Sequence, residues 1–169
     1  MIDQVFFNQA AAVLAACRAK DLVIATAESC TGGLVSAALT AIPGSSDVVD
    51  RGFVTYSNAA KIEMLGVPAA LLHEWGAVSE QVAIAMAEGA IRNSSASLAV
   101  AVTGIAGPSG SSDTKPIGLV HFAAVTSFGG VAHVERRLGN IGREDVRKRS
   151  VTQALELLRR LAQEHVLTA

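Results

Sequence analysis

The chain has 169 residues and a mass of 17.4 kDa, a length that suits one domain with a proper core and is short for two. Its 14 Lys and Arg residues balance 15 Asp and Glu residues without a long basic run, which argues against nucleic acid or an anionic membrane surface as partner. No apolar run reaches the roughly 18 residues that a membrane span needs, and the N-terminus lacks a secretory pattern. We therefore expect a single cytoplasmic domain over residues 1–169 that binds small molecules or copies of itself.

Apolar periodicity predicts alternating helices and strands in the first half of the chain. Apolar residues three to four positions apart indicate a helix over residues 3–20. A short buried strand, a polar turn and a second helix that closes at Pro43-Gly44 come next. The predicted elements of this half are helix 3–20, strand 22–26, helix 34–41, strand 47–56 and helices 59–65, 68–75 and 79–93.

The sequence of the second half of the chain predicts the remaining strands of a mixed sheet. Residues 98–103 are continuously apolar, as in a central strand buried on both faces, and the Gly, Ser and Pro residues of 104–116 indicate a loop. Segments 118–127 and 131–138 flank Phe128-Gly129-Gly130 and predict an antiparallel hairpin, with a final helix over 142–162. The expected fold is therefore α/β, a three-layer α/β/α sandwich with a mixed sheet of about five strands.

The first segment that could carry chemistry is the turn after the first strand. It presents Ser29 just before Thr31, Gly32 and Gly33, which are small enough to let a ligand approach the backbone. Unpaired amides at the start of the following helix can hold an oxyanion or a phosphate, which makes Ser29 a candidate nucleophile. Alternatively, Ser29 or Thr31 caps the helix and the two glycines permit close packing.

Cys30 competes with Ser29 for the role of nucleophile. A thiol at a helix N-terminus has a lowered pKa and enough thiolate to react. Adjacent residues in a turn usually point apart, so only one of the two faces a pocket, and a cysteine is often a small buried hydrophobe. Together with four scattered histidines, Cys17 and Cys30 give no metal-ligand spacing, so we expect neither a metal nor a cofactor.

A serine nucleophile needs a base, and none of the four histidines is well placed to supply one. They are His73, His121, His133 and His165. A lysine in a desolvated site is the alternative, and Lys61 follows a predicted strand end, where ligands bind in α/β sheets. Tyr56 lies on the same segment and can face the same site. The competing interpretation places Tyr56 at an interface and Lys61 on a solvated helix face.

Two further segments are candidates for binding. Thr103 and Gly104 open a second glycine-rich turn, which shares a sheet edge with Ser29 if the two preceding strands are parallel neighbours. The polar stretch 109–115 after it reads as a lid or as an ordinary flexible loop. Arg143 and Arg147 are four residues apart, on one helical face, and suit either a phosphate or ion pairs with Glu144 or Asp145.

Several strings around these residues resemble the CinA C-terminal family, and the resemblance covers nearly the whole chain. They are TAESCTGG at 26–33, GFVTYSN at 52–58, Lys61 with LGV at 65–67, GAVSE at 76–80 and TGIAGP at 103–108. Membership of this family implies an amidohydrolase without metal that converts nicotinamide mononucleotide and water to nicotinate mononucleotide and ammonia by Ser/Lys chemistry.

The resemblance also implies roles for individual residues. Ser29 corresponds to the nucleophile and Lys61 to its base. Tyr56 is the third residue that the resemblance places in the catalytic set, and it lines the site together with Ser46. The remaining residues are Thr103 and Gly104 beside the substrate, and Arg143, with Arg147 as its rival, at the phosphate. Two alternatives stay open, an amidohydrolase that uses Cys30 and a nucleotide-binding module without catalysis. The expected partners are a pyridine nucleotide and, from the Ala-rich first helix, further copies of this chain in a homo-oligomer.

Overall fold

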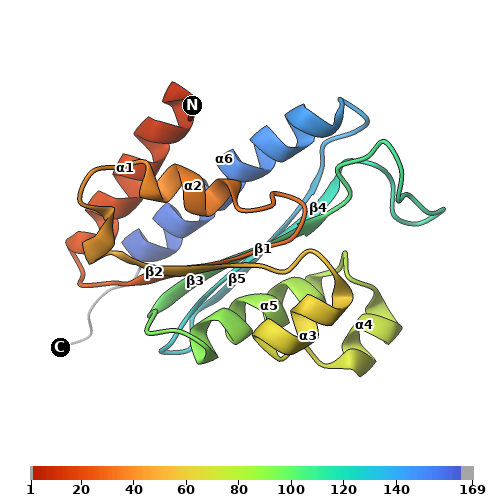
Figure 1. Cartoon of the computed structure of the whole chain (residues 1–169), viewed down its shortest axis with the longest axis horizontal. Helices are drawn as coiled ribbons and strands as arrows, with labels where there is room; N and C mark the ends of the chain where they lie inside the picture. Colours follow the sequence, from red (N-terminus) through yellow and green to blue (C-terminus); the bar gives the residue numbers. More distant parts are fainter. Residues whose placement is uncertain (1, 165–169) are drawn as a thin grey trace.

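A five-stranded sheet lies between two layers of helices in the computed structural model, which describes residues 2–164 (Figure 1). The strand order is β2-β1-β3-β4-β5, in which β1 pairs parallel with β2 and β3, and β4 pairs antiparallel with β3 and β5. The elements are α1 (Gln4–Arg18), β1 (Ile24–Glu28), α2 (Leu34–Thr40), the 3-10 helix η1 (Ser45–Asp47), β2 (Val49–Val54), α3 (Asn58–Leu65), α4 (Ala69–Trp75), α5 (Glu80–Arg92), β3 (Leu98–Gly104), β4 (Leu119–Thr126), β5 (Val131–Arg137) and α6 (Arg143–Glu164).

The predicted sandwich is confirmed, including the antiparallel hairpin and the central position of β3. Residues 98–103 are fully buried, which explains why this strand is continuously apolar rather than alternating. Helix boundaries follow the local signals of the sequence. Asp3 and Ser79 cap α1 and α5 through their side chains, and α3 ends at Gly66, whose φ of 66° suits glycine.

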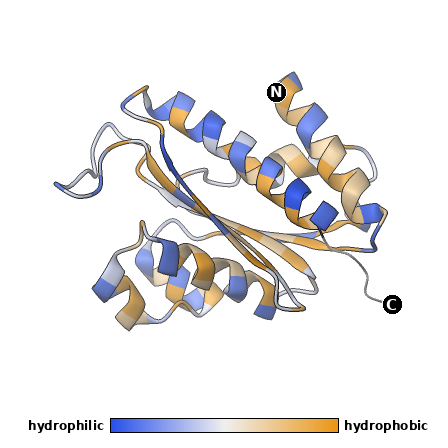
Figure 2. Cartoon of the chain, turned by 180° about the vertical axis from the view of Figure 1, so that it is seen from behind, coloured by the Kyte–Doolittle hydropathy of each residue, from blue (hydrophilic) through white to orange (hydrophobic). Residues whose placement is uncertain are grey.

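Each face of the sheet has its own apolar core. Helices α1, α2 and α6 cover one face, and α3, α4 and α5 cover the other (Figure 1). Figure 2 shows apolar strands in the middle and helices whose outer sides are hydrophilic. Side chains of β1 alternate between the two cores, since Ile24 packs with the α1 layer whereas Ala25 and Ala27 pack with the α5 layer. Within the described residues, no helix is long and apolar enough to cross a membrane.

The carboxyl ends of β1, β2 and β3 meet at one edge of the sheet. Glu28, at the end of β1, pairs with Val54 on one side and with Val102 on the other. The segments that follow β1, β2 and β3 therefore leave the sheet side by side. This confirms the parallel pairing on which the shared position of Ser29 and Thr103 depended, and it is the place where ligands bind in open α/β sheets.

Gly89 allows α5 to pack closely against the end of α3. A Cβ atom at this position would lie 2.1 Å from the Leu65 carbonyl oxygen, which belongs to rigid backbone. We therefore expect Gly89→Ala to push α3 away and to lower the free energy of unfolding by about 1–3 kcal/mol, measured by urea unfolding. Glu88→Ala, on the exposed side of the same helix, serves as control and should stay within about 0.5 kcal/mol of the unsubstituted protein. Equal stability of both variants would contradict the close packing.

Candidate active site

A buried lysine contacts the serine of the first turn. Lys61 Nζ, from α3, donates to Ser29 Oγ at 3.1 Å and to the Thr55 carbonyl oxygen at 2.8 Å. Lys61 is 1% exposed, although α3 itself lies at the surface. Ser57 caps α3 by accepting from the Ala60 amide, so the helix starts at the position that turns Lys61 inward. The alternative of a solvated lysine is therefore wrong.

Burial changes the acidity of this lysine. Desolvation of the ammonium lowers the pKa of Lys61 below its ordinary value, and the charge of a nearby Cys30 thiolate would oppose that shift. A neutral amine with one N–H on the Thr55 carbonyl has its lone pair free to accept the Ser29 hydroxyl proton. The geometry and the direction of the shift therefore both suit a general base.

The Glu28 carboxylate occupies the start of α2. It is fully buried and accepts from the amides of Gly33 and Val35 at 3.0 Å and of Ser36 at 2.8 Å. These amides were predicted to hold an oxyanion or a phosphate, and that prediction is wrong because a carboxylate of the chain already fills the positive end of the helix. The sequence analysis did not identify Glu28 as important. An acidic residue between a buried strand and a helix start could have indicated a carboxylate that caps the helix.

Thr31, Gly32 and Gly33 do not line the cleft beside Ser29, contrary to their expected role in substrate binding. Gly32 and Gly33 instead adopt φ values of 60° and 97°, which let the chain reverse between β1 and α2. The Gly32 amide donates to the Ser29 carbonyl at 3.0 Å. These residues therefore shape the turn that presents the serine, and Thr31 is fully buried behind it.

Cys30 borders the cleft but packs within the core on the α1 side of the sheet. It is 5% exposed, and burial raises the pKa of its thiol to about 12. A thiol with such a pKa holds almost no thiolate at neutral pH. Burial therefore disfavours Cys30 as nucleophile, and the Ser29 hydroxyl is the group in contact with Lys61.

A cleft of about 340 Å³ opens over Ser29 and Lys61, within the range of small-molecule sites. Five segments that are distant in sequence form its walls, namely residues 29–30, 56–61, 77–78, 103–110 and Arg143. Thr103 Oγ1 donates to the Ala77 carbonyl at 2.8 Å, which joins the segment 103–110 to the segment 77–78. The lining residues are Ser29, Cys30, Tyr56, Asn58, Lys61, Ala77, Val78, Thr103, Gly104, Ile105, Ala106, Gly107, Ser109, Gly110 and Arg143. Asn58 and Val78 were not anticipated.

The two arginines of α6 lie in different places. Arg143 lines the cleft and donates to the Gly107 carbonyl at 2.9 Å and to Tyr56 Oη at 2.8 Å. Arg147 instead donates to the carbonyl oxygens of Cys30 and Thr31 behind the turn. Neither one pairs with Glu144, whose partner is Lys148. Tyr56 lines the cleft, is 60% exposed and contacts Arg143, not Ser29 or Lys61.

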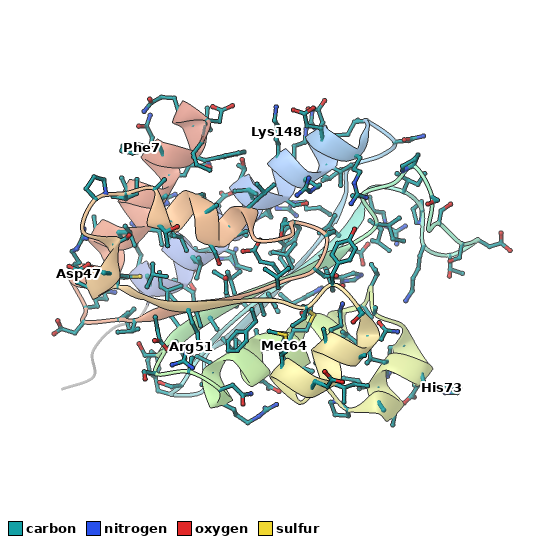
Figure 3. The ribbon with its side chains drawn as sticks, viewed as in Figure 1. Phe7, Asp47, Arg51, Met64, His73 and Lys148 are labelled. Carbon is teal, nitrogen blue, oxygen red and sulfur yellow. The ribbon has the colours of Figure 1, made fainter. Side chains whose placement is uncertain are left out.

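Ser46 does not reach the cleft. It lies exposed in η1, which precedes β2 and therefore sits at the opposite edge of the sheet from Ser29. Figure 3 shows its neighbour Asp47 at one end of the molecule, with the loop after β3 at the other. That loop is tied to α4 by Lys115, which donates to the Trp75 carbonyl.

The histidines lie outside the cleft wherever the structure describes them. His121 and His133 hydrogen-bond each other across β4 and β5, with 2.9 Å between Nδ1 and Nε2. Desolvation and His133 lower the pKa of His121. His73 lies on α4 (Figure 3), and His165 falls outside the described residues. Residues 2–164 contain no group of three or more His, Cys, Asp or Glu side chains that could hold a metal ion.

The fold and the cleft define an α/β sandwich with a buried serine–lysine pair at the carboxyl edge of its parallel strands. The model of the CinA C-terminal domain matches residues 7–162, and the chain belongs to this family.

Relatives support the assignment. A CinA-like protein of Synechococcus sp. (strain RCC307) is 54% identical over 151 residues, which cover 89% of this chain and 36% of that protein. A putative competence-damage inducible protein of Acetivibrio thermocellus is 49% identical over 140 residues, which cover 83% of this chain and 33% of that protein. The chain thus spans about a third of the length of these curated relatives.

Solved structures agree in fold. The competence/damage inducible protein CihA from Agrobacterium tumefaciens superposes with a TM-score of 0.94 at 51% identity, covering 96% of this chain and 99% of that one. The competence damage-inducible protein A (ComA) from Klebsiella pneumoniae gives a TM-score of 0.89 at 35% identity, covering 95% and 99% of the two chains.

The burial of Cys30 has a consequence for its reactivity. We expect iodoacetamide to leave Cys30 unmodified in the native protein at pH 8 and to alkylate it after unfolding, because the thiol is neutral and enclosed. Peptide mass spectrometry measures the modification. Cys17 is the internal control, since it is also free and buried, and burial raises the pKa of its thiol to about 12. Rapid alkylation of Cys30 alone would contradict the buried orientation.

Proposed function

We propose that this protein is an amidohydrolase that deamidates nicotinamide mononucleotide to nicotinate mononucleotide and ammonia by a Ser/Lys mechanism. The observation that carries the proposal is the 3.1 Å contact between Lys61 Nζ and Ser29 Oγ at the floor of the cleft. A serine beside a desolvated lysine is a nucleophile beside its base, and acyl transfer is the chemistry that this pair performs. The identity of the nucleotide rests on the resemblance of the site strings to the CinA C-terminal family.

The reaction proceeds in two halves. Neutral Lys61 takes the Ser29 hydroxyl proton while Oγ attacks the carboxamide carbon. The tetrahedral intermediate then loses its C–N bond, and Lys61 returns the proton to the leaving nitrogen, so that ammonia departs and an acyl ester remains on Ser29. Water attacks this ester while Lys61 takes a proton from it. Cleavage of the ester bond releases the acid, and Ser29 recovers its proton.

Arg143 is the cleft cation suited to the phosphate of the substrate. Its guanidinium is held by the Gly107 carbonyl and the Tyr56 hydroxyl, and this leaves other N–H groups for an anion. Tyr56 thereby orients Arg143, while the role in catalysis implied by the family resemblance remains a proposal. Gly104 keeps the cleft wall tight against β4, because a Cβ there would lie 2.8 Å from a Val120 methyl and 2.9 Å from the Leu119 carbonyl oxygen.

Removal of either member of the pair tests the proposal. We expect Ser29→Ala and Lys61→Met each to lower ammonia release from nicotinamide mononucleotide by roughly 10³-fold or more, because one lacks the nucleophile and the other the base. Ser127→Ala, in the exposed turn between β4 and β5, is the matched control and should keep full turnover. Ammonia release by Ser29→Ala close to that of the unsubstituted protein would refute the mechanism. Tight nucleotide binding without product by the unsubstituted protein would instead favour a non-catalytic binding module.

The pH dependence of the reaction follows from the lysine. Only the neutral amine accepts a proton, so kcat/KM should rise with pH and level off above the pKa of Lys61 in the folded protein. Burial places that pKa below the 10.5 of an ordinary lysine, and the plateau should therefore begin at a lower pH than 10.5. Initial rates across a pH series, with stability checked at each pH, measure the profile. A rate that falls through this range would contradict the assignment of Lys61 as base.

A further inference from the structure

Two histidines share a hydrogen bond behind one wall of the cleft. His121 on β4 and His133 on β5 approach within 2.9 Å between Nδ1 and Nε2, and their rings stack with centroids 5.2 Å apart. His121 is buried and His133 is half-buried. His121 lines a second cavity of about 260 Å³, and Val78 lines both this cavity and the cleft. The segment around Val78 is therefore part of both walls.

The sheet register and a helix start connect the pair to the cleft. His121 lies directly opposite Thr103 on β3, and side chains directly opposite each other lie on the same face of a sheet. Thr103 in turn donates to the Ala77 carbonyl at the cleft. His133 Nδ1 lies 3.8 Å from Glu80 Oε1, in the first turn of α5. The pair therefore adjoins both elements that fix Ala77, namely β3 and the start of α5.

The number of protons on the pair decides whether its hydrogen bond can exist. One ring nitrogen must donate and the other must accept, so the bond holds one proton between the rings. A first additional proton goes to the outer nitrogen that is still free. Both outer nitrogens have a carboxylate nearby, because Glu135 lies 3.9 Å from His121 Nε2 and Glu80 faces His133. A second additional proton places N–H groups on both facing nitrogens, and the two cationic rings must separate.

Charged groups of three elements surround the pair. They are Glu80 on α5, Glu135 and Arg137 on β5, and Lys115 in the loop after β3. Desolvation and the charge of His133 lower the pKa of His121 below its ordinary 6.5, and Glu135 opposes this shift. The unfolded chain therefore binds a proton at this site more readily than the folded one. The free energy of unfolding contributed by His121 accordingly falls as the pH drops through 6.5.

We propose that His121 and His133 are positioning residues for the cleft wall, and that acid opens their hydrogen bond by placing protons on both facing nitrogens. At neutral pH the pair holds β4 and β5 against the start of α5. Once it separates, Thr103 and Ala77 lose the support behind them, and the cleft binds its ligand less tightly. The acid response of the fold is independent of the proposed deamidation, whereas the effect on substrate binding rests on it.

Thermal unfolding across a pH series tests the pair without any substrate. Between about pH 7.5 and pH 5, the Tm of the unsubstituted protein should fall by about 2–5 °C more than that of His133→Gln. The terminal amide of Gln can take the place of Nε2 and keep a hydrogen bond to His121, but it binds no proton. Lys61 contributes alike to both proteins, so the difference isolates the pair. His73→Gln removes an exposed histidine of α4 and should follow the unsubstituted protein.

A second variant covers the case in which the first folds poorly. His121→Asn replaces the other side of the hydrogen bond, because the Asn amide can take the place of Nδ1. It should flatten the Tm profile in the same way as His133→Gln. Tm profiles that run parallel in the unsubstituted protein and in both variants would overturn the proposal.

Hydrogen exchange measures the cleft wall itself. The Val82 amide donates to the Ser79 hydroxyl at 3.3 Å and marks the start of α5. At about pH 5.5, the peptide that covers residues 76–83 should exchange about threefold faster in the unsubstituted protein than in His133→Gln. The intrinsic exchange rate is the same in both, since the peptide has one sequence. Equal exchange would overturn the positioning role.

Steady-state kinetics connects the wall to the proposed function. Protonation of Lys61 affects both proteins alike, whereas opening of the pair should raise KM for nicotinamide mononucleotide. Between about pH 7.5 and pH 5.5, this KM should rise about threefold more in the unsubstituted protein than in His133→Gln. Matching KM profiles in two active proteins would overturn the effect on substrate binding. If the unsubstituted protein releases no ammonia, the proposed function fails, and unfolding and exchange still decide on the pair.

Discussion

Three amide hydrogen bonds to the Glu28 carboxylate determine the shape of the turn on which the site depends. A fully buried carboxylate is costly unless hydrogen bonds replace its water, and the first amides of α2 supply them. The strand end is thereby joined to the helix start across Ser29. The Ser29 amide donates to the Val102 carbonyl and its carbonyl accepts from Gly32. The backbone of Ser29 is therefore fixed on both sides, which is the preorganisation that the proposed role of Ser29 as nucleophile requires.

Burial of Lys61 lowers the pKa of its amine and makes the free energy of unfolding depend on pH. Its lowered pKa means that the unfolded chain binds more protons than the folded one at pH values between the folded pKa and 10.5. The free energy of unfolding contributed by this group accordingly rises with pH across that interval, and below it the protein bears the cost of an ammonium held in the core. The Thr55 carbonyl and Ser29 hydroxyl offset part of this cost. A strained preference for the neutral amine is the property that a base needs.

Local patterns predicted the helices, the strands and their layers. The spacing of apolar residues, the capping residues and the glycines that end helices are all properties of short segments. Ser29 and Lys61 were also within reach of sequence, since parallel neighbouring strands end at one edge. The same rule would have shown that Ser46 lies away from Ser29. It precedes β2 and therefore lies at the amino ends of the parallel strands, opposite the edge where Ser29 lies. The contacts of Arg143 and Arg147 join residues 36 to 117 positions apart, and no local pattern specifies such pairs.

Two arginines of α6 contact different parts of the candidate site. Arg143 and Arg147 are separated by one turn, yet α6 crosses the sheet edge so that the first meets the cleft and the second meets the back of the β1–α2 turn. Every group of the proposed reaction lies between Ser29 and Arg143, inside the segment matched by the family model. The proposed deamidation therefore requires nothing from the additional length of the longer relatives.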